Sequence, residues 1–173
     1  MEYNTDHFLS MLAKMNISLS DKQLQQFMTY YEMLIEKNKV MNLTAITDPT
    51  EIVTRHFLDC AALAPYMPQD GRVLDVGTGA GFPGMPLAIL CPQTEFVLLD
   101  ALRKRIDFLN EVIAELGLTN VTAVHARAED YARDNRGTFD LAASRAVADL
   151  RVLSELALPM VKVGGAFLAM KAE

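Results

Sequence analysis

The sequence predicts an α/β fold, in which a mostly parallel β-sheet is flanked by helices and preceded by a helical N-terminal portion. From Arg72 onward, short β-rich runs alternate with helical ones, as in βαβ units joined into a parallel sheet. Before that point, apolar residues recur at the three- and four-residue spacings of a helix face. We therefore expect a helical portion over residues 1–68 and an α/β unit over residues 69–173.

Two apolar patterns define the helical portion. The first comprises Phe8, Leu9, Met11, Leu12, Leu24, Phe27, Met28, Tyr31, Leu34 and Ile35. Within it, the stretch SLSDKQ predicts a helix start at Ser18 or Ser20, because a hydroxyl before acid and amide residues is typical of an N-cap. The second pattern runs from Ile52 to Leu63 and ends near Pro65.

Five β-rich runs follow, each short enough to be one strand. They are RVLDVG (72–77), EFVLLD (95–100), VTAVHA (121–126), FDLAAS (139–144) and GAFLAMK (165–171). Between the second and third runs, apolar residues over 106–116 predict a helix that Gly117 ends. In such a parallel sheet the ligand crevice lies at the carboxyl ends of the strands.

Composition favours a globular protein with one core and argues against nonspecific nucleic-acid binding and metal binding. The chain has 173 residues, of which 51% are hydrophobic, enough for one core. Its net charge of -6 argues against nonspecific coating of nucleic acid, so a nucleic-acid substrate would require a local basic patch. Cys60 and Cys91 fit no metal-ligand spacing and are expected to be buried reduced thiols. We expect no metal site.

The sequence also bears on localisation. No window approaches the roughly 18 consecutive apolar residues of a membrane span. The N-terminus has no basic flank or small-residue cleavage site. We therefore expect a cytoplasmic protein without a membrane partner. Separately, we expect the protein to act as a monomer.

The stretch VLDVGTGAGFPG has two competing interpretations. Counted from Gly79, it matches the GxGxxG of dinucleotide-binding proteins, with Asp100 near the position of the ribose-binding acid. Counted from Asp75, it reads D-x-G-x-G-x-G through Gly77, Gly79 and Gly81. A third possibility is a tight βα turn with no ligand.

The pattern that starts at Asp75 resembles motif I of the class I S-adenosylmethionine-dependent methyltransferases, which have a Rossmann-like fold. In that interpretation Gly77, Gly79 and Gly81 allow the cofactor to approach the backbone closely. Asp100 would accept hydrogen bonds from the two ribose hydroxyls. The alternative role of Asp100 is to cap the helix that follows it.

Four stretches make the resemblance more specific: NLTAI (42–46), RHFLD (55–59), GTGAGFPGMPLAI (77–89) and SRAVADL (144–150). Together they resemble the bacterial small-subunit ribosomal RNA guanine-N7 methyltransferase family, formerly glucose-inhibited division protein B. The resemblance covers essentially the whole chain. It implies S-adenosylmethionine as cofactor and 16S ribosomal RNA or the small ribosomal subunit as partner, with a guanine of the 530-loop region as target.

The same resemblance implies cofactor contacts at Gly77, Phe82, Ala128, Glu129 and Arg145. Arg145 is also the candidate catalytic residue, since its guanidinium could face the cofactor or hold the nucleotide by a phosphate or by O6. For Glu129 the alternative is a solvated loop acid. For Arg145 it is a surface salt bridge with Asp149.

The chemistry requires little from side chains. N7 of guanine carries a lone pair and no proton, so the reaction needs positioning and no general base. Phe82, Arg145 and His56 are candidates to stack the exposed base, although a lone histidine among apolar neighbours is more often structural. RNA contacts would come from the basic residues Arg55, Arg103, Lys104, Arg105, Arg145, Arg151, Lys162 and Lys171.

The chain departs from the family at its end. It stops at Glu173, after the fifth expected strand, so we expect the two C-terminal strands of the class I fold to be missing from it. Either the sequence is truncated or the edge of the sheet is completed in another way. Two other functions remain open: a methyltransferase acting on a small molecule, and a noncatalytic scaffold that binds cofactor or RNA.

Overall fold

The computed structural model describes residues 4–145 and 149–170. Helical segments occupy the N-terminal part, and strands alternate with helices after it. In chain order the elements are α1 (Thr5–Lys14), α2 (Asp21–Met41), α3 (Pro49–Glu51), the π-helix η1 (Ile52–Leu58), α4 (Asp59–Ala61), the 3-10 turn η2 (Ala64–Tyr66), β1 (Arg72–Val76), α5 (Gly84–Leu90), β2 (Glu95–Asp100), α6 (Arg103–Leu116), β3 (Val121–His125), α7 (Ala128–Asp134), β4 (Phe139–Arg145), α8 (Leu150–Ala157), the 3-10 turn η3 (Leu158–Met160) and β5 (Val161–Met170).

The five strands form one parallel sheet in the order β3-β2-β1-β4-β5. This confirms the predicted α/β fold. The strand order reverses direction beside β1, and ligands of such sheets bind at the carboxyl ends of the strands at this point. β5 starts earlier than expected, at Val161, and the expected strand end at Lys171 lies outside the described residues.

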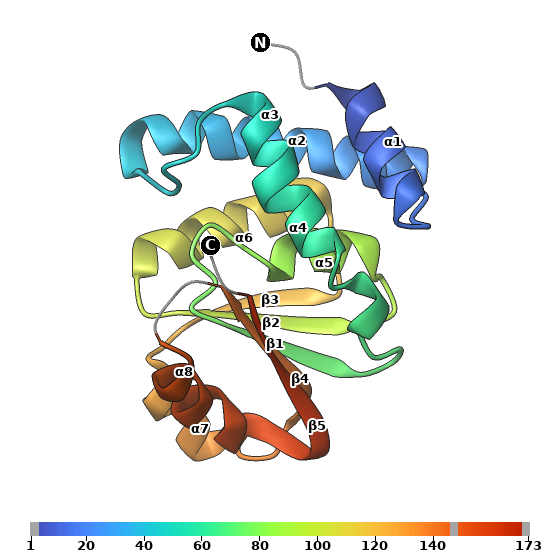
Figure 1. The fold of residues 1–173 in the computed structure, drawn as a ribbon. Coiled ribbons are helices and arrows are strands. Elements are labelled where there is room, and N and C mark those ends of the chain that lie inside the picture. Colours follow the sequence, from blue (N-terminus) through green and yellow to red (C-terminus); the bar gives the residue numbers. More distant parts are fainter. Residues whose placement is uncertain (1–3, 146–148, 171–173) are drawn as a thin grey trace.

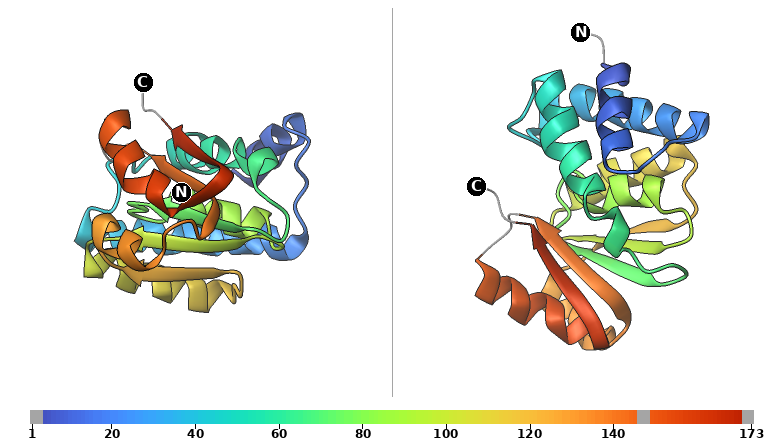
Figure 2. Two further views of the ribbon diagram at one scale, coloured as in Figure 1. Left: turned by 90° about the horizontal axis from the view of Figure 1, so that it is seen from below. Right: turned by 45° about the vertical axis from the view of Figure 1, so that its right-hand side comes forward.

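Helices cover the sheet in layers, as Figures 1 and 2 show. α5 and α6 pack on one face, and α2 packs in turn on both of them. α7 and α8 lie together on the other side of the sheet. Side chains of β1 alternate between the two faces: Val73 belongs to the larger buried cluster, whereas Leu74 and Val76 belong to the smaller one.

The helical N-terminal portion is joined to the α/β part by a shared core. Buried Phe8 and Phe27 belong to the same cluster as Val73 of β1. α2 begins at the expected serine, since Ser20 forms a capping box with Gln23. The division at residue 68 stays a prediction, although η2 ends at Tyr66 and β1 begins at Arg72.

The apolar pattern from Ile52 to Leu63 does not fold as one α-helix. The stretch Ile52–Leu58 is a π-helix, with short α-helical turns before and after it. π-helical segments are rare and occur frequently at functional sites. Here the π-helix buries His56 together with Phe57.

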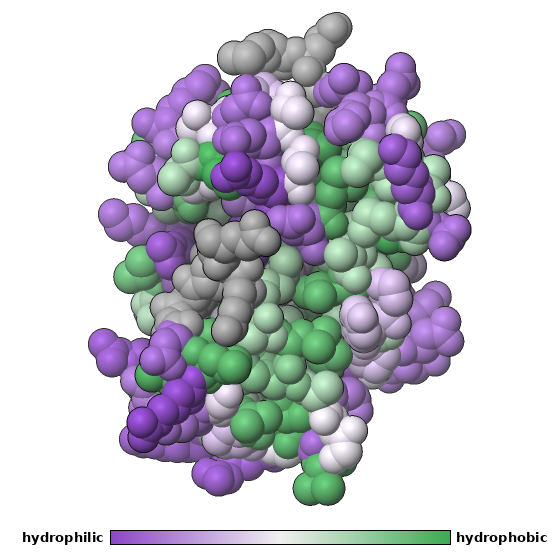
Figure 3. Space-filling model, viewed as in Figure 1, coloured by the Kyte–Doolittle hydropathy of each residue, from purple (hydrophilic) through white to green (hydrophobic). Residues whose placement is uncertain are grey.

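The surface over β4 and β5 is apolar (Figure 3). Within the described residues β5 pairs with β4 alone, and Val163 is fully exposed. Cys60 is buried and Cys91 half-buried, and both are free thiols. Among the described helices, none has the length and apolar character to cross a membrane.

Candidate cofactor and substrate site

A cavity of about 530 Å³ opens where β1, β2 and β4 end. The glycine loop after β1 and the residues after β2 form one part of its wall, and the segment between α2 and η1 contributes another part. The lining residues are Leu43, Thr44, His56, Gly77, Thr78, Gly79, Ala80, Phe82, Asp100, Ala101, Leu102, Arg105 and Arg145.

The three glycines of the loop have left-handed backbones but different surroundings. The φ angles are 67° at Gly77, 61° at Gly79 and 109° at Gly81. A Cβ on Gly79 would meet no atom within 4 Å, whereas one on Gly81 would lie 2.7 Å from the hydroxyl of Tyr30. Gly77 and Gly79 line the cavity, and Gly81 allows α2 to pack closely against the loop. A cofactor contact at Gly81 stays a prediction.

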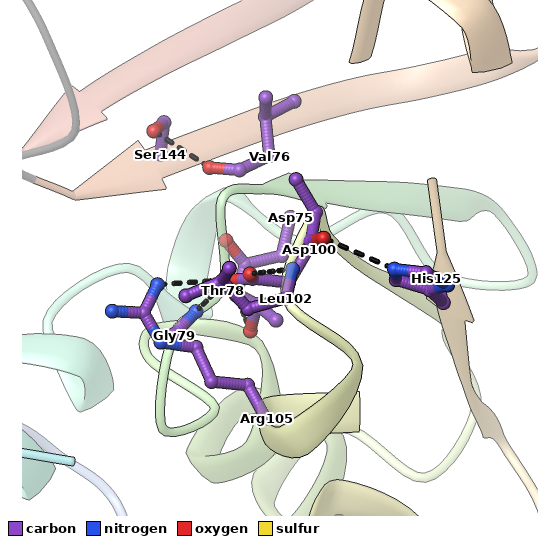
Figure 4. Close-up of polar contacts among 10 residues, drawn as sticks. Asp75, Val76, Thr78, Gly79, Asp100, Leu102, Arg105, His125 and Ser144 are labelled. Carbon is purple, nitrogen blue, oxygen red and sulfur yellow. Dashed lines mark hydrogen bonds and ion pairs between the residues drawn. The ribbon is translucent and has the colours of Figure 1, made fainter. Parts of the chain in front are cut away.

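Asp75 is buried and holds the glycine loop through hydrogen bonds. Its Oδ2 accepts hydrogen bonds from the Thr78 hydroxyl and from the Gly84 amide, each over 2.8 Å. Figure 4 shows it beside Thr78 and Asp100. Burial raises the pKa of the Asp75 carboxyl to about 7. Asp75 thus fixes the turn and does not line the cavity.

Asp100 lines the cavity and connects two loops. Its Oδ2 accepts from the Gly79 amide over 2.9 Å, and its Oδ1 accepts from the Leu102 amide over 2.9 Å. Arg105 lies 3.4 Å from Oδ2. The N-cap residue of α6 is Leu102, so Asp100 braces the start of that helix without being its cap. A carboxylate held at the cavity wall suits a ligand with vicinal hydroxyls.

Arg145, His56 and Phe82 form a stacked cluster. Arg145 donates to the Arg55 carbonyl over 3.1 Å and to Nδ1 of His56 over 2.7 Å. The His56 ring is parallel to Phe82 within 13°, with a centroid distance of 4.3 Å, and the Arg145 guanidinium carbon lies 4.8 Å from the Phe82 centroid. Because Phe82 is only 4% exposed, it offers no open face to a base in this arrangement.

The alternative prediction was a salt bridge between Arg145 and Asp149. Among the described residues, Arg145 is instead bonded to Arg55 and His56. Asp149 instead caps α8 by accepting from the Arg151 amide. His56 is buried and both of its ring nitrogens are hydrogen-bonded, in line with its interpretation as a structural residue.

Thr44 is one of six lining residues to which the sequence interpretation gave no role; the others are Leu43, Thr78, Ala80, Ala101 and Leu102. The Thr44 hydroxyl lies 2.9 Å from Nε2 of His56. Thr44 belongs to the NLTAI stretch. That stretch contributed to the family resemblance, but no role was predicted for any of its residues. The partnership with His56 could not be found from spacing.

Ala128 and Glu129 lie at the start of α7 and do not line the cavity. Glu129 is within 3.4 Å of Arg127 on the surface. The strand before them nonetheless reaches the site, because His125 contacts the carbonyl of Ala101, a lining residue, over 3.0 Å. Cofactor contacts at Ala128 and Glu129 stay predictions.

The basic residues do not all converge on the cavity. Arg105 and Arg145 line it. Lys162 stands at the amino end of β5, away from the carboxyl ends of the strands, and pairs with Asp140. The other described members of this basic set do not line the cavity: Arg55 pairs with Glu51, Arg151 pairs with Glu155, and Arg103 donates to Nδ1 of His125 over 3.0 Å. Lys104 does not line the cavity either, and Lys171 lies outside the described residues.

The fold is that of the class I S-adenosylmethionine-dependent methyltransferases. A methyltransferase of this kind from Aquifex aeolicus superposes with a TM-score of 0.53 at 21% identity, covering 74% of this chain and 67% of that one. An rRNA methylase from Streptococcus thermophilus superposes with a TM-score of 0.52 at 20% identity, covering 66% of this chain and 69% of that one. These structures support the fold.

The sequence comparisons give the family. The family model for rRNA small subunit methyltransferase G (GidB) matches residues 23–173. Ribosomal RNA small subunit methyltransferase G of Desulfitobacterium hafniense is 54% identical over 91% of this chain and 66% of its own length. The protein of the same name from Lactococcus lactis is 48% identical, over 96% of this chain and 72% of its own length. The chain therefore belongs to the rRNA small subunit methyltransferase G family and spans about two thirds of the length of these relatives.

Family membership decides between the two interpretations of the glycine loop. The pattern that starts at Asp75 is the methyltransferase motif, and the dinucleotide interpretation is wrong. S-adenosylmethionine is the cofactor of the family. Gly77, Gly79 and Asp100 line the cavity, and their contacts with the cofactor stay predictions.

Proposed function

We propose that this chain transfers a methyl group from S-adenosylmethionine to N7 of a guanine in 16S ribosomal RNA. The observation that carries the proposal is the composite cavity. One part of its wall is the glycine loop with Asp100, and another is formed by Thr44, His56 and Arg145. The second set comes from NLTAI, RHFLD and SRAVADL, stretches outside the glycine motif that is shared by many methyltransferases.

The cofactor would be held by the loops after β1 and β2. Gly77 and Gly79 leave room beside the backbone, and Asp100 presents carboxylate oxygen to ribose hydroxyls. When bound, S-adenosylmethionine supplies an electrophilic methyl group on a sulfonium centre. Asp100 also fixes the loop through the Gly79 amide, so the site is shaped before the ligand arrives.

The acceptor would be positioned by residues of the helical portion and of β4. N7 of guanine has no proton to remove, so the chain needs a surface that orients the base. Arg145 is fixed by Arg55 and His56, and the guanidinium retains further N–H groups for O6 or a phosphate. Its role as the catalytic contact belongs to this proposal.

The test is methyl transfer from radiolabelled S-adenosylmethionine into small-subunit ribosomal RNA, free or in the subunit, from cells that lack the enzyme. We would use this chain and a form extended to the length of its relatives. The expected result is label on one guanine, with Gly79→Ala and Arg145→Ala reducing it and Arg133→Ala, an exposed arginine of α7, having no effect.

Other outcomes of this experiment would favour one of the two alternative functions. Activity on metabolites with none on RNA would establish a small-molecule methyltransferase. Cofactor binding without label in either form would indicate a noncatalytic scaffold. We further propose a cytoplasmic monomer; light scattering that shows a dimer would contradict the monomer.

A further inference from the structure

The hydrogen bonds around His56 have a fixed direction. A guanidinium only donates, so Nδ1 of His56 must accept from Arg145, 2.7 Å away. Burial, followed by the charge of Arg145, lowers the pKa of His56 to about 4, so the ring is neutral at pH 7. A neutral imidazole with an accepting Nδ1 carries its hydrogen on Nε2. His56 therefore donates to the hydroxyl oxygen of Thr44 over 2.9 Å.

The same hydroxyl oxygen has a second donor. The amide of Ile46 donates to it over 3.1 Å. A hydroxyl has two lone pairs and one hydrogen, so these two bonds occupy both lone pairs. Thr44 can then act only as a donor. Among the described residues no acceptor takes its hydrogen, and Thr44 lines the cavity.

The backbone holds this hydroxyl in place. The Thr44 amide donates to the Asn38 side chain over 2.8 Å, and Asn42 ends α2 in the left-handed conformation with a φ of 49°. The donor thus stands on the part of the cavity wall that the helical portion provides. A ligand there meets one fixed hydrogen-bond donor beside Arg145.

We propose that Thr44 donates its hydroxyl hydrogen to O6 of the target guanine and thereby selects guanine over adenine. The inference rests on the proposed methylation of guanine N7. O6 and N7 lie on the same edge of guanine, so a base presenting N7 to the cofactor also presents O6. Adenine carries an amino group in place of O6, and a hydroxyl without a free lone pair cannot accept from it.

In this scheme His56 is a positioning residue, and Arg145 positions it in addition to its proposed contact with the nucleotide. An unconstrained threonine hydroxyl accepts as readily as it donates and would not distinguish the two purines. The chain from Arg145 through His56 removes the accepting capacity of Thr44. Specificity is thus set by residues from two segments about ninety positions apart.

The experiment measures kcat/KM with ribosomal RNA carrying guanine, or 2-aminopurine, at the target position. 2-Aminopurine keeps N7 but has hydrogen in place of O6. Thr44→Val should lower kcat/KM on guanine by about tenfold or more, a loss of about 1.4 kcal/mol, and Thr44→Ser should restore most of it. On 2-aminopurine the wild-type protein and Thr44→Val should be equal.

Two controls separate this role from a structural one. Thr54→Val, at an exposed position of η1, should leave both rates unchanged. Calorimetric affinity for S-adenosylmethionine should be unaffected by Thr44→Val. Equal losses on both RNAs, a weakened cofactor affinity, or full activity of Thr44→Val on guanine would each overturn the inference. A wild-type protein that labels no RNA would refute the proposed function itself.

Discussion

The backbone amide of Gly79 donates a hydrogen bond to Oδ2 of Asp100 over 2.9 Å. This bond joins the loop after β1 to the residue that ends β2, so the two features that we predict to bind the cofactor form one unit. The carboxylate also holds the Leu102 amide and lies near Arg105. Removing its charge would affect the shape of the loop and the ligand contact together.

Asp100→Asn should weaken binding of S-adenosylmethionine by about tenfold or more, because hydrogen bonds to a charged acceptor are worth about 1.5–3 kcal/mol. Isothermal titration calorimetry measures the affinity. Asp107→Asn, an exposed acid on α6, is the matched control and should bind as the wild type does. Unchanged binding by Asp100→Asn would remove this residue from the cofactor site.

Alanine at two of the loop glycines should have different effects. Gly79→Ala places a methyl group in the open cavity and should weaken cofactor binding, with a loss of about 1 kcal/mol in stability from its left-handed backbone. Gly81→Ala meets the Tyr30 hydroxyl and should lower the free energy of unfolding by more than that. Urea titration and calorimetry separate the two quantities.

Gly137→Ala is the control for this pair. Gly137 also has a left-handed backbone, with a φ of 58°, and open space at Cβ, but it does not line the cavity. It should show the stability loss of Gly79→Ala without the binding loss. Equal binding by the Gly79 and Gly137 variants would contradict the placement of Gly79 at the cofactor.

Tyr30→Phe should destabilise the protein and loosen the glycine loop. The buried Tyr30 hydroxyl donates to the Ala80 carbonyl over 2.6 Å. Leaving that carbonyl unpaired in the interior costs about 1–3 kcal/mol. We expect a lower midpoint in urea and weaker cofactor binding, because Ala80 lines the cavity. Tyr66→Phe, at an exposed position, should change neither.

Asp75→Asn should change how stability depends on pH. Folding raises the pKa of this buried carboxyl from 3.8 to about 7, so its contribution to stability is fully present below pH 3.8 and is lost as pH rises through 7. The free energy of unfolding of the variant, relative to wild type, should therefore rise by about 1–4 kcal/mol between pH 4 and 7.5. A constant difference in urea titrations across this range would show that Asp75 is ionised in the folded protein.

The sequence by itself determined the parallel α/β sheet, the glycine loop and the position of Asp100 at a strand end. These features follow from local rules: the period of apolar residues sets strand or helix, and closely spaced glycines mark a turn whose backbone conformation other residues rarely adopt. Strand ends in a parallel sheet must then meet at one edge, so Gly79 and Asp100 could be expected to be neighbours.

The tertiary structure alone decided the partners of Arg145 and the reason for Gly81. Arg145 meets His56, and through it Thr44, only because the π-helix and the segment after α2 lie beside the carboxyl end of β4 and bring these distant segments together. Gly81 is required by the hydroxyl of Tyr30, which reaches the loop from α2. Such contacts depend on how whole helices pack, and no periodicity within a single segment encodes which side chain of another segment will lie opposite.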